Sequence, residues 1–246
     1  MLRNKKLWLL LISLSSALSA APAVNPQIFN LDTIMGTAQF SQNVMLMLSL
    51  AMISILPFIL MTTTSFLRTV IVLGFVRSAI GTQQTPPSAV IISIALFLTV
   101  YIMTPVWQEI NTTALQPYQA GTITQQVAFE KGIVPVKNFM LRQTREKDLV
   151  LFIEFSKIPP ITDIKDVPMY VLMPAFILSE LSTAFKIAFV IFLPFVVVDM
   201  VVSNVLLSLG MFMLSPVMIS LPFKILLFVL ADGWYLITQG IVQSFL

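Results

Sequence analysis

Cysteine and histidine are both absent from this chain of 246 residues. Their absence excludes thiol catalysis, histidine acid–base catalysis and the usual zinc sites. Charged residues are also scarce, at 10% of the sequence against about 25% in an ordinary soluble domain. The sequence contains no glycine-rich phosphate loop and no cluster of metal-ligating residues. We therefore expect no catalytic site, no metal and no cofactor.

Apolar residues dominate what is present, with 57% of the sequence and a mean hydropathy of +0.94. A soluble fold of this length could not cover that much apolar surface, so lipid or a large assembly must cover part of it. The formal charge of +3 comes from Arg3, Lys5 and Lys6, because the rest of the chain has equal numbers of basic and acidic residues. A nucleic-acid partner is therefore not indicated.

Residues 1–21 have the composition of a secretory signal peptide. Basic residues precede a short apolar run at 7–14, and Ser19 and Ala21 supply the small residues of a cleavage site before Pro22. The alternative is an uncleaved first span. The apolar run is shorter than the roughly 20 residues that a membrane helix needs, so cleavage is favoured.

Residues 22–107 are predicted to form a pair of apolar helices. The first is densest in apolar residues at 44–61, where Pro57 should kink or end the helix. The second covers residues 88–107, which carry no charge. Both segments have the length and hydropathy of membrane spans.

The segment between these helices is interpreted as a connector on the cytoplasmic side. Arg68 and Arg77 lie there, as the positive-inside tendency favours. Residues 81–87 follow, and their glycine and paired prolines should break one helix and open the next.

Residues 108–167 differ from the rest because they hold 14 of the 25 charged residues in the chain. Charged and apolar residues at 137–157 have the spacing of one or two amphipathic helices. We expect a small helical insertion exposed to water in the periplasm. Glu146 and Asp148 are interpreted as part of its solvated face.

Residues 168–246 are apolar again and are predicted to form helical hairpins. They divide into apolar segments at 169–198, 200–223 and 225–246, each of which contains proline or glycine. Such broken helices need protein or water around the exposed backbone. Hydropathy thus predicts about four spans in an all-α integral membrane protein.

Glu180 and Lys224 stand out because each lies within apolar sequence. An isolated charge in hydrocarbon usually faces a partner or a wet cavity. The two residues are therefore candidates for a pair across an interface, and the alternative is that each lies at a segment end with its charge in water. Other candidates for buried charges are Arg68, Lys186, Asp199 and Asp232.

Residues 210–216 form the second candidate feature. Gly210 and Pro216 bracket a predicted bend that contains Met211, Phe212 and Met213. Methionine is flexible and fills irregular gaps, so one such loop from each of several subunits would form a deformable hydrophobic seal around a pore. The alternative is ordinary packing, since the chain has 14 methionines.

Five blocks of sequence, in order and spacing, resemble the FliP family of flagellar type III export-gate proteins. They lie at residues 65–73, 81–87, 95–99, 174–181 and 220–234. The resemblance covers nearly the whole mature chain, and residues 108–167 are the least similar part. The related SctR family of injectisomes shares these blocks, but the signal peptide favours the flagellar branch.

The resemblance implies a channel-forming subunit in the bacterial inner membrane, at the flagellar basal body and required for flagellum assembly. Several copies would join FliQ-like and FliR-like membrane subunits in a helical gate, with FlhB-like and FlhA-like export components nearby. Unfolded flagellar proteins would be the cargo. Members of this family form an assembly that stands partly above the bilayer, so the resemblance does not require all four apolar segments to cross it.

The resemblance also assigns roles to particular residues. Met211, Phe212 and Met213 would form the gasket of the closed pore, with Phe212 in place of the usual methionine. Glu180 of one copy would pair with Lys224 of the next. A different hypothesis, from the charges alone, is a small oligomeric secondary transporter with Glu180, Lys224 and Asp199 as an ion relay.

Overall fold

The computed structural model describes residues 37–82, 84–156 and 163–245, and every regular element in those ranges is a helix. The all-α prediction is therefore confirmed. The chain divides into two units, one ending at Ile55 and one beginning at Leu56. The predicted signal peptide, residues 1–21, lies outside the described residues.

The first described helix is α3, Thr37–Thr63, which includes an apolar candidate span at Asn43–Thr63. Pro57 was predicted to kink or end this helix, and the helix continues past it to Thr63, so the second alternative is wrong and the kink stays a prediction. The span has a mean hydropathy of 2.5. Lipid or another protein must therefore cover it.

Helix α4, Phe66–Ile80, corrects the predicted connector. Arg68 and Arg77 lie on this helix and not in a loop. Val72 and Val76 are fully buried, so α4 is a core element. The predicted break is confirmed at Gly81, whose φ of 89° provides the left-handed cap that commonly ends a helix.

Helix α5, Ser88–Ile110, begins directly after Pro87, as predicted. A π-helical turn at Asn111–Leu115 and α6, Gln116–Gln119, prolong it, so the continuous helical stretch runs from Ser88 to Gln119. The predicted amphipathic helices are confirmed as α7, Gln125–Gln143, and α8, Glu146–Ser156. A short 3-10 turn, Ile164–Asp166, precedes the C-terminal helices.

Helix α9, Met169–Ser208, is 40 residues long and runs through Pro174, Pro194 and Asp199. It is thus longer than the predicted segment at 169–198. Helix α10, Pro216–Leu230, and helix α11, Gly233–Gln243, follow and meet at a bend of 64°. Three described helices are long and apolar enough to cross a membrane, or four if the bent pair counts as one span, in agreement with the prediction.

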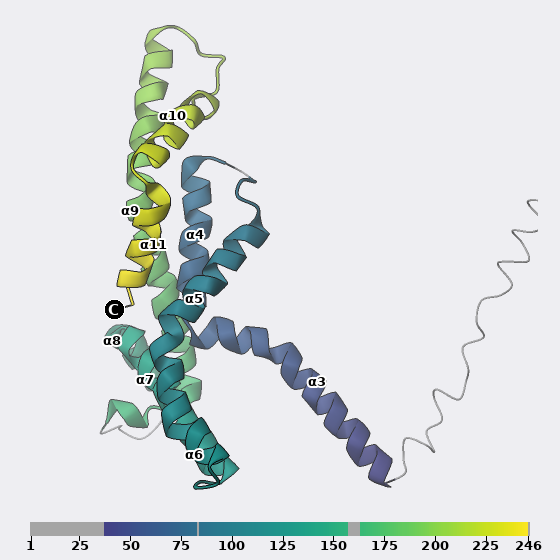
Figure 1. Ribbon diagram of the computed structural model, residues 1–246. Helices are drawn as coiled ribbons and strands as arrows, with labels where there is room; N and C mark the ends of the chain where they lie inside the picture. Colours follow the sequence, from purple (N-terminus) through teal and green to yellow (C-terminus); the bar gives the residue numbers. More distant parts are fainter. Residues whose placement is uncertain (1–36, 83, 157–162, 246) are drawn as a thin grey trace, which may run out of the picture. The chain divides into compact units, whose positions relative to one another are not determined.

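Helix α9 is the central element of the second unit. It lies beside α4, α7, α8 and α10 (Figure 1). One core cluster joins α9 to α5, α7 and α8, and it includes Met140, Leu172 and Phe176. Two further clusters join α9 to α4, with α5 and α11 in one and with α10 in the other. Most of the second unit is therefore organised around this one long helix.

The bend between α10 and α11 depends on glycine at position 233. A Cβ atom there would lie 2.2 Å from Cε2 of Phe228, so the ring would have to move. We expect Gly233→Ala to lower the free energy of unfolding by about 1–3 kcal/mol, the usual range for overpacking. Thermal unfolding of the detergent-solubilised protein, followed by circular dichroism, measures this change.

Gly240→Ala, in the same helix, is the matched control. A Cβ atom at Gly240 would meet nothing within 4 Å, and alanine favours a helix more than glycine does. This variant should be as stable as the parent or slightly more stable. Equal unfolding temperatures for both variants would contradict the tight contact at Phe228.

Candidate functional site

A buried ion pair between α4 and α9 forms the polar centre of the second unit. The Nε of Arg68 donates to Oε2 of Glu180 at 2.9 Å, and Nη2 of Arg68 donates to Oε1 of the same carboxylate. Only 2% of the Arg68 side chain is exposed and none of Glu180 is. Two parallel bonds of this kind fix both distance and orientation.

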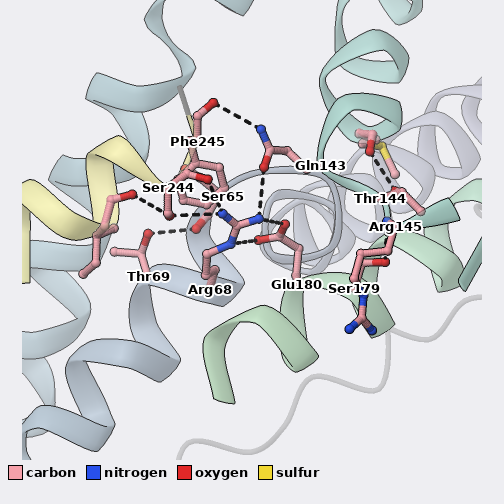
Figure 2. Close-up of polar contacts among 12 residues, drawn as sticks. Ser65, Arg68, Thr69, Gln143, Thr144, Arg145, Ser179, Glu180, Ser244 and Phe245 are labelled. Carbon is pink, nitrogen blue, oxygen red and sulfur yellow. Dashed lines mark hydrogen bonds and ion pairs between the residues drawn. The ribbon is translucent and has the colours of Figure 1, made fainter. Parts of the chain in front are cut away.

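The remaining guanidinium donors of Arg68 reach two other elements (Figure 2). Its Nη1 donates to the carbonyl and the hydroxyl of Ser244 at 2.7 and 3.1 Å. Its Nη2 also donates to Oε1 of Gln143 at 3.1 Å. Guanidinium has five N–H donors, so all five have an acceptor. Full satisfaction is what makes a buried arginine tolerable.

An aromatic ring completes this site. The guanidinium carbon of Arg68 lies 3.8 Å from the centroid of the Phe245 ring, a cation–π contact. The Phe245 ring also stacks on Phe139, with centroids 6.1 Å apart, and its carbonyl accepts from Nε2 of Gln143 at 3.2 Å. The segment after α11 is thus held against α4 and α7.

A second polar group lies one residue away on α9. The Ser179 hydroxyl donates to Oδ2 of Asp148 at 2.6 Å, and Nε of Arg145 donates to the same oxygen at 2.7 Å. Asp148 is buried, which corrects its assignment to a solvated face, whereas Glu146 is exposed as predicted. Burial alone would raise the pKa of Asp148, but the hydrogen bonds from Ser179 and Arg145 outweigh it and hold that pKa below its usual value.

A third polar group joins α9 to α10. Nζ of Lys224 and the hydroxyl of Ser220 each lie 2.5 Å from an oxygen of the Asp199 carboxylate. Lys224 and Ser220 are buried, and Asp199 is partly exposed. The sequence predicts that Glu180 of one copy of the chain pairs with Lys224 of the next copy. Within one chain, each of these residues has a different partner, and the pair between copies stays a prediction.

Residues 209–215 form the loop between α9 and α10, at the end of this hairpin farthest from α7 and α8 (Figure 1). Gly210 has φ of 72° and Pro216 is the first residue of α10, so both lie where a hinge was predicted. The exposed fractions of Phe212 and Met213 are 76% and 99%. The loop presents apolar side chains that the described residues leave largely uncovered.

The other two predicted charges are on the surface. Lys186 on α9 is exposed, and so is Asp232, whose φ of 50° places it in the left-handed region at the α10–α11 bend. Among the described residues, no group of three or more aspartate or glutamate side chains is placed to hold a metal ion.

Comparison with known proteins identifies the family of this chain. A family model described as the FliP family matches residues 49–241. The chain belongs to the FliP family. The matched range includes Arg68 with Gln143 and Glu180, the Asp199 group and the loop at 209–215, and it ends before Ser244 and Phe245.

Individual FliP proteins are similar over most of their length. The flagellar biosynthetic protein FliP of Bacillus subtilis is 52% identical over 83% of this chain and 93% of its own length. The protein of the same name from Pectobacterium carotovorum is 46% identical, over 85% of this chain and 81% of its own length. That of Caulobacter vibrioides is 42% identical over 99% of this chain and 92% of its own length.

Several residues of the polar groups described above could not be identified from the sequence alone. Gln143, Ser244 and Phe245 have no pattern that marks them, because their partner Arg68 is far away in sequence. For Asp148, the one local signal is Arg145 three residues earlier, a spacing that allows an ion pair on one helical turn.

The two possible partners of Lys224 can be separated by charge exchange. Lys224→Glu should reduce the amount of assembled complex, because it places two carboxylates together. Adding Asp199→Lys should restore assembly, since it rebuilds the pair within the chain. Adding Glu180→Lys should not, because it places a second cation beside buried Arg68. Native gel analysis of membranes measures the complex. Rescue by Glu180→Lys and not by Asp199→Lys would assign Lys224 to the next copy.

Asp148 should make stability depend on pH. Its pKa is lowered in the folded state, so its stabilising contribution is present above the ordinary aspartate pKa of about 3.9 and is lost as pH falls through the folded value. Asp148→Asn should lower the free energy of unfolding by about 1–3 kcal/mol at neutral pH and should reduce the further loss in acid. Unfolding temperatures at pH 7 to 3 test this, with exposed Asp163→Asn as control. Parallel curves for Asp148→Asn and the parent would contradict it.

Proposed function

We propose that this chain is a channel-forming subunit of the flagellar type III protein export apparatus, and that it is not an enzyme. Membership of the FliP family carries this proposal, because the matched relatives are named flagellar biosynthetic proteins. The geometry supports it through one observation, the exposed apolar loop at 209–215. Several copies would assemble so that their loops meet.

The loop has the properties of a deformable seal. Met211, Phe212 and Met213 are 43%, 76% and 99% exposed, and all three are apolar. Methionine adapts its shape to its neighbours, and apolar constrictions close a pore by excluding water. A ring of these loops would block ions and yet open when an unfolded chain passes, since only weak apolar contacts separate.

The outer surface of the hairpin supports an oligomer. A groove of about 460 Å³ lies between α9 and α10, and only valine, leucine, isoleucine and phenylalanine side chains line it. Exposed apolar surface of this extent needs lipid or protein to cover it. We propose that other copies of the chain and FliQ-like and FliR-like membrane subunits share this role with lipid, with FlhB-like and FlhA-like components nearby.

The proposed location is the bacterial inner membrane, within the flagellar basal body. Three apolar helices of sufficient length support a membrane location. The charged helices α7 and α8 would then lie on the periplasmic side, where water covers their exposed charges. The unfolded cargo would be the flagellar proteins that this apparatus exports.

The ion-relay hypothesis has less support from the geometry. Glu180 is bound by Arg68, and Asp199 is bound by Lys224 and Ser220. All three proposed relay groups are therefore held in two separate ion pairs. A relay needs groups that can exchange a proton with a neighbour along a path.

Replacing both loop methionines should open the seal. In cells that form the complete complex, Met211→Gly with Met213→Gly should raise the leak of small ions severalfold, because the constriction loses its apolar side chains. Sodium uptake and growth at high salt measure the leak. Phe212→Met, which keeps an apolar side chain in the loop, should remain closed. An unchanged leak at an equal amount of complex would contradict the seal.

A further inference from the structure

Residues 244 and 245, here called the latch, connect α11 to the centre of the second unit. Arg68 donates two hydrogen bonds to Ser244, and its guanidinium lies over the Phe245 ring. Gln143 donates to the Phe245 carbonyl. Backbone and side-chain groups of the latch are thus both bound, so this end of α11 is fixed.

The other end of α11 is fixed by close packing. Gly233 lies so near Phe228 that no Cβ fits between them, and Trp234 contacts the Phe228 ring edge to face, with centroids 5.3 Å apart. The Phe228 ring also packs near Phe195 of α9, at 6.4 Å between centroids. Because α11 is held at both ends, a displacement of the latch would also displace the start of α11 and the end of α10 that packs against it.

Helix α10 begins at Pro216, directly after the loop at 209–215. A polar tie from Lys224 and Ser220 to Asp199 joins it to α9, and so does the contact of Phe228 with Phe195. The polar tie lies nearer the loop, and the aromatic contact lies nearer α11. Helix α11 contacts the same Phe228 through Gly233 and Trp234, so the connection through α11 contributes to the direction of α10.

The same guanidinium also holds the other stem of the loop. Arg68 binds Glu180 on α9, and α9 leads into the loop after Ser208. Both stems of the loop are therefore positioned relative to one side chain. We propose that Arg68 and the latch are positioning groups that hold the 209–215 loop at its sealing position, an inference that rests on the proposed function.

A distance measurement within one chain tests this proposal. The chain has no cysteine, so Glu154→Cys and Leu209→Cys place two spin labels, one on α8 and one in the loop outside the three seal residues; Leu209 is 67% exposed. Labelled chains are diluted with unlabelled chains in the complex, so that pulsed electron paramagnetic resonance measures the distance between two labels on the same chain. Phe245→Leu keeps an apolar side chain but removes the aromatic ring. It should shift and broaden the distance distribution and raise the ion leak severalfold.

Phe129→Leu is the matched control, because Phe129 is 71% exposed on α7. It should leave the distance distribution and the leak at parent values, and Phe245→Tyr, which retains the ring, should do the same. An unchanged distribution in Phe245→Leu overturns the proposal, whatever the leak. A shifted distribution without a leak supports the latch and counts against the loop as a seal.

If Phe245→Leu does not accumulate, Ser244→Ala provides the same comparison. This variant removes one acceptor of Arg68 and retains the carbonyl, so a smaller shift in the same direction is expected. An unchanged distribution for Ser244→Ala would then overturn the proposal.

Discussion

The buried pair of Arg68 and Glu180 sets the arrangement of the second unit. A guanidinium and a carboxylate with almost no exposure are tolerable only when their hydrogen-bonding groups have partners, and here Glu180, Gln143 and Ser244 supply every acceptor that Arg68 needs. Replacing one member alone would cost on the order of 3–5 kcal/mol. Because the acceptors belong to α9, to the end of α7 and to the segment after α11, one side chain on α4 fixes where these elements meet.

Apolar contacts alone would not give this arrangement a unique register. Valine and leucine side chains lie along most of α9, and such contacts are non-directional. Two polar ties remove the ambiguity, at Glu180 and at Asp199. They are 19 residues apart on one helix, which corresponds to about 28 Å at 1.5 Å per residue. The first tie sets the register of α9 against α4, and the second sets the register of α9 against α10 near the loop.

The sequence was sufficient for features with a local signal. Uncharged runs marked α3 and α5, glycine and paired prolines marked the break at 81–87, and Gly210 and Pro216 marked the α9–α10 loop. It was insufficient where the partner is remote. Arg68 was placed in a connector because its carboxylate is 112 residues away. The predicted segment stops at residue 198 because Lys224 and Ser220, which bind Asp199, are also remote in sequence, whereas α9 continues past Asp199.

The loop at 209–215 and the two helices that flank it are stabilised in different ways, and the difference fits the proposed seal. The stems are held by charged hydrogen bonds with defined angles, which resist sliding and pivoting. The loop has apolar side chains, and Met213 is almost wholly exposed within its own chain. In the proposed pore, neighbouring subunits would cover these side chains, so its closed state would depend on assembly. Contacts between apolar side chains have no preferred angle, so in the proposed pore they would separate and re-form as cargo passes, while the polar ties would return each loop to the same position.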